Sequence, residues 1–170
     1  VYAASAALCV ALALLGGLVL ATRAGPAGLS LPIGLPWIGA SLRLDALSAL
    51  FLVLLGTGGA TSSVYGIGYG RHEEEPLRVL AFFPGFLGAM GLVLLADDAF
   101  TFLMSWEVMS LLSWALVLTH HRAAAAREAG FIYLVMAGFG TMMLLLAFGI
   151  LAGAQGGYGF DAIRAAARAP

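Results

Sequence analysis

Glu107 is the residue whose type and position most strongly suggest chemistry. It lies in the middle of a long apolar run, within Met-Ser-Trp-Glu-Val-Met-Ser at residues 104–110. Placing a charged carboxylate at the centre of a lipid bilayer costs at least ~2.5–3.5 kcal/mol. Such a group pairs with a partner, faces a polar cavity or stays protonated, and each state suits a group that takes up and releases protons. The alternative is a structural carboxylate that is hydrogen-bonded between helices.

Helical periodicity places further side chains on the face of Glu107. Ser110, Trp114 and His121 follow it at three, seven and fourteen residues, and Leu103 precedes it by four. A hydrogen-bonded stripe of this kind would lead from mid-membrane to His121, whose imidazole titrates near neutral pH. The candidate proton-translocation residues are therefore Glu107, Ser110, Trp114 and His121. His121 also fits an ordinary place in an interfacial loop.

Asp45 is a further candidate, at the start of another apolar run. It follows Arg43 by two residues, so a local ion pair with Arg43 is one interpretation. Because a helix N-terminus attracts negative charge, a contact with the helix dipole is another. We interpret Asp45 as structural, with a role in proton coupling as the alternative.

The composition argues against most other kinds of chemistry. The single Cys9 leaves no internal disulfide, CxxC redox pair or self-contained iron–sulfur site. No spacing of His, Cys, Asp and Glu resembles a metal or haem site, so we expect no cofactor and no metal on this chain. Neither a Ser/His/Asp arrangement nor a phosphate-binding glycine loop occurs, which argues against an enzyme active site. The net charge of −1 makes nucleic acid an unsuitable partner.

The elements that must position these residues are membrane helices. Of the 170 residues, 62% are hydrophobic and 10% are charged, which is too little polar surface for a water-soluble domain. A lipid bilayer is the expected solvent, and its hydrocarbon core of ~30 Å requires about 20 helical residues per span. The sequence predicts an all-α integral membrane protein with about five spans, at 1–22, 42–70, 78–96, 98–119 and 128–152.

The separators between these spans are short. Residues 23–41 hold three prolines and four glycines, and they predict an irregular extracytoplasmic loop. Residues 153–170 predict an interfacial tail that contains a short helix over Phe160–Ala169. The compact loops 71–78 and 120–127 contain four arginines, so the positive-inside rule places both in the cytoplasm.

Several motifs resemble one family of membrane proteins, the antiporter-like subunits of respiratory complex I and of Mrp-type cation/proton antiporters. The motifs are Arg-Leu-Asp-Ala-Leu-Ser at 43–48, Ala-Asp-Asp at 96–98, and Trp106-Glu107 followed by Ser110 and Ser113. The segment 102–110 is most similar to the branch found in membrane-bound hydrogenases, which includes hydrogenase-4 component B and formate hydrogenlyase subunit 3. The resemblance covers about residues 40–165, and Trp106-Glu107 is its most specific part.

This resemblance implies a subunit of the inner (plasma) membrane that moves protons or exchanges them for sodium, with Glu107 as the proton-coupling carboxylate. It implies a fold of about fourteen helices with inverted repeats, of which this chain would hold the opening part. The family's lysine partners would lie on helices after residue 170, since this chain contains no lysine. We therefore expect an N-terminal piece of a longer subunit. Its partners would be other membrane subunits and a peripheral redox module, either a hydrogenase or a dehydrogenase.

Two other classes stay open. A membrane scaffold or assembly protein would use Glu107 only to anchor helix packing. A small channel-type transporter would line a path with the hydroxyls of the second span, Thr57, Thr61 and Ser62. Loss of proton pumping on Glu107→Gln would favour the family interpretation and tolerance of that change a scaffold. Passive conductance without a redox partner would favour a channel.

Overall fold

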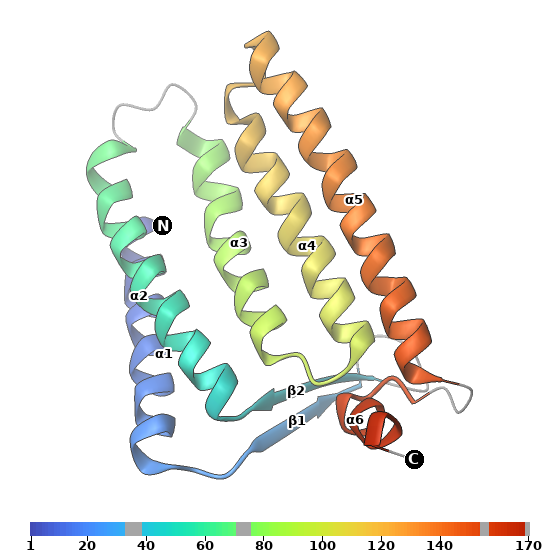
Figure 1. Ribbon diagram of the computed structural model, residues 1–170. Coiled ribbons are helices and arrows are strands. Elements are labelled where there is room, and N and C mark those ends of the chain that lie inside the picture. Colours follow the sequence, from blue (N-terminus) through green and yellow to red (C-terminus); the bar gives the residue numbers. More distant parts are fainter. Residues whose placement is uncertain (33–38, 71–75, 154–156, 169–170) are drawn as a thin grey trace.

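Five long helices dominate the computed structural model, which describes residues 1–32, 39–70, 76–153 and 157–168. They are α1 (Tyr2–Thr22), α2 (Ala46–Tyr69), α3 (Pro76–Leu95), α4 (Ala99–Val117) and α5 (Ala124–Ala152). The other described elements are β1 (Ala27–Leu31), β2 (Ala40–Leu44), the 3-10 turn η1 (Leu118–His120) and α6 (Phe160–Arg168). Figure 1 shows the long helices side by side, with the two strands and α6 gathered at one end. This end is called the hairpin end below.

The long helices have the length and composition of membrane spans. Among the described residues, α1, α2, α4 and α5 are long and apolar enough to cross a membrane, and α3 contributes the shorter apolar stretch Val79–Leu95. The 29 residues of α5 extend about 44 Å at a rise of 1.5 Å per residue. That exceeds a hydrocarbon core of ~30 Å, so α5 must tilt or project from it. The chain is a multi-pass helical membrane protein.

Several helices begin at other residues than the expected spans. α2 begins at Ala46 rather than residue 42, because 40–44 form β2 and Asp45 caps the helix. α5 begins at Ala124, four residues before the expected start at 128, since the alanines there are strong helix formers. α3 begins at Pro76, inside the expected loop 71–78, and residues 71–75 lie outside the described part of the chain.

The expectation of an irregular loop over 23–41 is wrong where β1 (27–31) and the start of β2 (40–41) fall. β1 and β2 pair in antiparallel register, with Ala27 opposite Leu44 and Leu31 opposite Ala40. The three prolines of the segment fall outside both paired stretches. Proline lacks the N–H that a strand ladder requires, so its placement leaves the pairing intact.

Small residues bring α1 and α2 into close contact along their length. A Cβ at Gly56 would lie 2.5 Å from the Cys9 carbonyl oxygen, and a Cβ at Gly16 would lie 2.5 Å from that of Ala49. Only glycine fits where two helix backbones approach this closely. The contact between α2 and α3 is much sparser.

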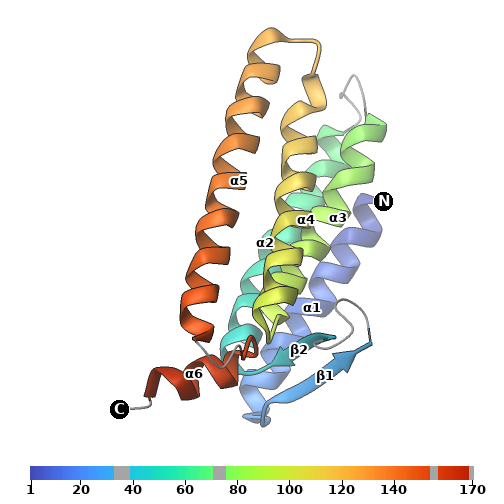
Figure 2. The same ribbon diagram turned by 90° about the vertical axis from the view of Figure 1, so that its right-hand side faces the viewer.

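A belt of backbone hydrogen bonds joins segments that are distant in sequence at the hairpin end. The Asp97 N–H donates to the Ser41 carbonyl (2.9 Å), and the Phe160 N–H donates to the Asp97 carbonyl (3.0 Å). The belt therefore ties β2 to the α3–α4 turn and that turn to the start of α6. Figure 2 shows α6 lying across this end of the helices.

Candidate functional site

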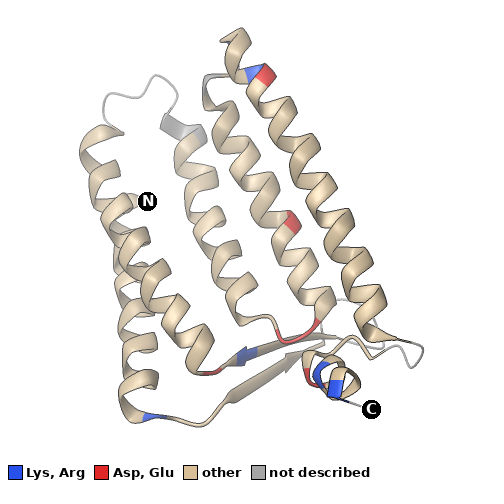
Figure 3. Ribbon diagram, viewed as in Figure 1, with Lys and Arg blue, Asp and Glu red and all other residues tan. Residues whose placement is uncertain are grey.

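Glu107 is the only charged residue of α4, and it occupies the ninth of the 19 positions of this helix. Figure 3 shows the coloured charged positions gathered toward the two ends of the helices, apart from one acidic position midway along α4. Glu107 is partly buried. No described residue forms a hydrogen bond or an ion pair with its carboxylate. A carboxyl group at mid-membrane without a partner in this part of the chain is available to exchange a proton.

The face of α4 that carries Glu107 is open to its surroundings. Met104 and Leu111 lie one turn before and after Glu107 on the same face, and they are 52% and 48% exposed. Val108 beside them is 45% exposed. The described helices therefore leave one side of the Glu107 site uncovered.

Ser110 and Trp114, the next two candidates, lie on the more covered side of α4. Ser110 is only 5% exposed. The indole Nε1 of Trp114 lies 3.5 Å from the position that a Cβ would take at Gly130 of α5. Helical geometry keeps both residues within one to two turns of Glu107, on the flank away from Met104 and Leu111, and Trp114 borders α5.

His121 is not a position of the same helix as these residues. α4 ends at Val117, and η1 separates its last turn from His121. A 3-10 turn has three residues per turn rather than 3.6, so the spacing of fourteen residues alone does not fix the angle between Glu107 and His121. His121 is half-buried, and its backbone carbonyl accepts a hydrogen bond from Arg127 Nη1 (3.0 Å). His121 thus lies beyond the end of α4, and its place on one stripe with Glu107 stays a prediction.

Asp45 is the N-cap of α2. Its Oδ1 accepts hydrogen bonds from the backbone N–H groups of Ser48 (2.9 Å) and Leu47 (3.0 Å), and the Ser48 hydroxyl accepts one from the Asp45 N–H (2.8 Å). This reciprocal arrangement is a capping box. The Ser48 backbone N–H is the largest cause that holds the pKa of Asp45 below its usual range. Of the two interpretations of Asp45, the structure therefore shows the contact with the N-terminus of α2 and not an ion pair with Arg43.

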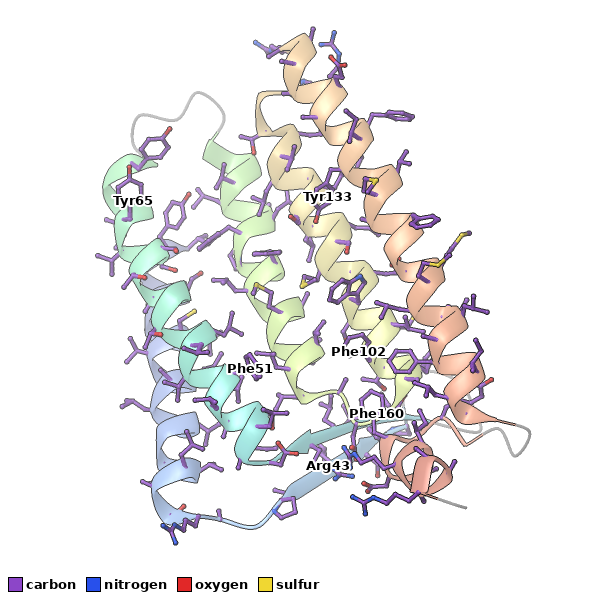
Figure 4. The ribbon with its side chains drawn as sticks, viewed as in Figure 1. Arg43, Phe51, Tyr65, Phe102, Tyr133 and Phe160 are labelled. Atoms are coloured by element: carbon purple, nitrogen blue, oxygen red, sulfur yellow. The ribbon has the colours of Figure 1, made fainter. Side chains whose placement is uncertain are left out.

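Arg43 instead forms ion pairs with carboxylates from two distant elements. Its Nε lies 2.9 Å from Asp97 Oδ1, and its Nη2 contacts Asp161 Oδ2 of α6. Arg164, one turn further along α6, lies 2.6 Å from the same Asp161 carboxylate. The guanidinium of Arg43 holds the pKa of Asp161 below its usual range. Figure 4 shows Arg43 close to Phe160 at the hairpin end.

Asp98 has a different role from its neighbour Asp97. It is 2% exposed, and its carboxylate accepts hydrogen bonds from the Thr101 N–H (2.7 Å), the Thr101 hydroxyl (2.6 Å) and the Ser41 N–H (2.9 Å). Asp98 therefore caps α4 and also holds β2 against it. An Asp directly before an apolar run is a recognisable N-cap signal, but nothing in the sequence indicated the contact with Ser41.

The described side chains offer no ready metal site. Within the described ranges, no group of three His, Cys, Asp or Glu residues lies close enough to hold a metal ion. The chemistry that this arrangement supports is proton exchange at Glu107, in a membrane helix with one open side.

Comparison with known proteins decides the family. Residues 96–169 match the family model described as NADH:quinone oxidoreductase/Mrp antiporter, TM. This part of the chain belongs to that family. The match begins at the α3–α4 turn and includes α4 with Glu107, α5 and α6.

Individual relatives agree with this assignment to the antiporter-like subunits. The chain is 37% identical over 139 residues to the uncharacterized protein Rv0083 of Mycobacterium tuberculosis, covering 78% of this chain and 22% of that protein. It is 30% identical over 132 residues to hydrogenase-4 component B of Escherichia coli, covering 76% of this chain and 20% of that protein. The chain thus spans about a fifth of the length of these two relatives.

The fold also matches a solved structure of a respiratory complex. The structure of the membrane-bound sulfane sulfur reductase, an archaeal respiratory membrane complex, contains a chain that superposes with a TM-score of 0.78 at 18% sequence identity. The superposition covers 93% of this chain and 32% of the other. The helices, the hairpin and α6 therefore form part of an antiporter-like fold.

Proposed function

We propose that this chain is part of a subunit that translocates protons across a membrane, and that the Glu107 carboxyl group takes up and releases them. The observation that carries the proposal is an ionisable side chain at the middle of a membrane helix, with no partner among the described residues. Burying such a group without a function costs free energy that natural helices rarely tolerate. Membership of the antiporter-like family supports the same assignment.

We further propose that the energy comes from redox chemistry in a partner module. Hydrogenase-4 component B, a relative at 30% identity, is a hydrogenase component by name, and the family model includes NADH:quinone oxidoreductase. Other membrane subunits would then cover the open face of α4, where Met104 and Leu111 are exposed. The loop that contains Arg122 and Arg127 would face the cytoplasm.

A channel through the second span has less support. The Thr57 and Thr61 hydroxyls donate to carbonyls of their own helix, those of Val53 (2.8 Å) and Thr57 (3.0 Å). The space next to Ser62 is otherwise lined by apolar side chains and glycines. Hydroxyls that are already hydrogen-bonded and an apolar wall make a poor path for hydrated ions.

The test is proton pumping by the full-length subunit in its complex, reconstituted in vesicles, with Glu107→Gln compared with wild type. Gln keeps the shape and hydrogen-bonding capacity of Glu but cannot titrate. We expect pumping to fall to background while electron transfer by the assembled complex can still be measured. Glu128→Gln is the matched control, since Glu128 is an exposed acid near the start of α5.

Unchanged pumping in Glu107→Gln would contradict the proposal and favour a scaffold role. Proton leak in the absence of the redox substrate, equal in both proteins, would favour a channel.

A further inference from the structure

A narrow apolar groove runs between α2 and α3. Its volume is about 430 Å³, and its walls include aromatic side chains from both helices and two adjacent glycines of α2. The residues that define its length are Phe51 and Ser62 on α2 and Phe83 and Leu94 on α3. Figure 4 shows Phe51 on the side of α2 that faces α3.

A second, charged cavity of about 270 Å³ lies at the hairpin end of this groove. It shares the lining residues Phe51 and Leu94 with the groove, so the two spaces are adjacent. Its charged lining residues are Arg43, Asp45, Asp97 and Arg164. The combined space is therefore amphipathic, with ionic groups where the helices end and apolar walls along the membrane helices.

The ionic groups of this cavity retain unused hydrogen-bonding capacity. Arg43 uses its Nε and Nη2 in ion pairs, and Arg164 uses its Nη1. Asp45 accepts its hydrogen bonds at Oδ1, and Asp97 meets Arg43 at Oδ1. No described residue bonds the remaining guanidinium N–H groups or the Oδ2 atoms of Asp45 and Asp97. The cavity thus offers donors for an anion and acceptors for an ammonium group.

The length of the groove indicates what kind of molecule fits it. Phe51 to Ser62 spans eleven residues, which is about 16 Å at 1.5 Å per residue. That is half of the ~30 Å hydrocarbon core, the length available to one acyl chain in one leaflet. The groove therefore has the length of one acyl chain in one leaflet, and its apolar lining matches such a chain.

We propose that this site binds one phospholipid with a primary-ammonium headgroup, of the phosphatidylethanolamine class. One acyl chain lies between α2 and α3. The phosphate accepts hydrogen bonds from Arg43 and Arg164, and the ammonium donates to the free oxygens of Asp45 and Asp97. The lipid fills the gap that the sparse contact between α2 and α3 leaves.

The experiment uses the full-length protein in vesicles of equal parts phosphatidylethanolamine and phosphatidylglycerol. A phosphatidylethanolamine probe with a photoactivatable acyl chain is added, and labelled peptides are mapped by mass spectrometry. We expect labelling of residues 51–62 and 83–94. Unlabelled phosphatidylethanolamine should compete better than phosphatidylcholine, whose quaternary headgroup has no N–H.

Two variants distinguish lipid binding in the groove from nonspecific labelling by bulk lipid. Gly58 lines the groove, and a Cβ there meets no atom within 4 Å, so Gly58→Leu fills the groove without disturbing the backbone. Gly68→Leu is the matched control, because Gly68 has the same open surroundings but does not line the groove. We expect Gly58→Leu to abolish labelling and Gly68→Leu to retain it.

The exposed Arg164 tests the headgroup contact separately. Because Arg164 contacts the phosphate, which both lipid classes carry, Arg164→Gln should reduce labelling by the phosphatidylethanolamine probe about threefold, the effect of one exposed charged contact, and leave the preference over phosphatidylcholine unchanged. Equal labelling by both lipid classes, or undiminished labelling in Gly58→Leu, would overturn the proposal. Absence of label from α2 and α3 would also overturn it, and would mean that a protein segment covers the groove.

Discussion

Ser48 and Ser63 are both buried on α2, but their hydroxyls are in opposite situations. Ser48 accepts from the Asp45 N–H within the capping box, whereas Ser63 Oγ is fully buried and has no partner among the described groups. Removing a buried, unsatisfied hydroxyl relieves a desolvation cost, while removing a cap leaves a donor unpaired. Replacing each of the two serines by alanine is therefore expected to change the free energy of unfolding in opposite directions.

We expect Ser63→Ala to raise the free energy of unfolding by about 1 kcal/mol and Ser48→Ala to lower it by about 1 kcal/mol. Thermal unfolding of the purified protein in a mild detergent measures both. A loss of stability in Ser63→Ala would show that the hydroxyl has a partner in the intact protein.

Asp45 gives the stability of the protein a pH dependence. Its pKa in the folded protein lies below the usual value of ~3.9. The cap therefore contributes fully above that value, and its contribution is lost as the pH falls through the lower folded-state pKa. Asn is also a good N-cap but does not titrate. Between about pH 5 and pH 3, Asp45→Asn should lose less stability than wild type, as measured by unfolding temperature. If the unfolding temperatures of wild type and Asp45→Asn fall equally with pH, Asp45 is not the source of this pH dependence.

Much of the residue-level chemistry was predictable because it is local. An Asp before an apolar run predicts a cap, whereas the functional role that an acid inside an apolar span suggests for Glu107 stays a prediction. The end of α4 at Val117 and the 3-10 turn before His121 were not predicted, because hydropathy alone does not mark them. The same holds for the pairing of Arg43 with Asp161, since no periodic signal connects residues 118 positions apart.

At the scale of elements, the five apolar helices follow from hydropathy and length alone. The β-hairpin was missed because prolines and glycines between its strands suggested irregular backbone. The alternation in Ala-Ser-Leu-Arg-Leu at 40–44 was the available signal for a strand. The contact between α1 and α2 was only partly predictable, since small residues allow a close approach without specifying which helix approaches.

Substitutions at Gly56 and Gly58, both on α2, test the contact between α1 and α2. A Cβ at Gly56 would meet the Cys9 carbonyl oxygen and the Ala13 N–H within 2.7 Å, whereas a Cβ at Gly58 would meet no atom within 4 Å. We expect Gly56→Ala to lower the free energy of unfolding by about 2 kcal/mol. Gly58→Ala should raise it by up to about 1 kcal/mol, because alanine favours helix. Equal effects in an SDS unfolding titration would mean that α1 and α2 separate easily.

At the scale of the whole molecule, Arg43 connects three parts of the chain through its side chain. It lies on β2 and pairs with the α3–α4 turn at Asp97 and with α6 at Asp161. Phe160 of α6 also packs against Phe102 and Phe148, so α6 should stay folded when the ion pairs are removed but open more often.

We expect Arg43→Gln to speed amide hydrogen exchange in 160–168 by up to about fivefold, the size typical of exposed ion pairs. Arg23→Gln is the control, since Arg23 is the exposed C-cap of α1 and its side chain forms no hydrogen bond or ion pair with a described residue. Exchange that is unchanged in Arg43→Gln would mean that the aromatic contacts and the backbone belt alone hold α6.

The separation of Arg43 and Asp161 by 118 residues also has a consequence for biogenesis. The hairpin and the contact of α1 with α2 involve neighbouring segments and can form while the rest of the chain is still being translated. Asp161 leaves the ribosome roughly ten seconds after Arg43 at ordinary rates of synthesis. During that interval Asp97, which is translated between the two, is the one acidic partner of Arg43 that can already form its ion pair. The docking of α6 is therefore the last step in forming the hairpin end. It follows the synthesis of all five long helices.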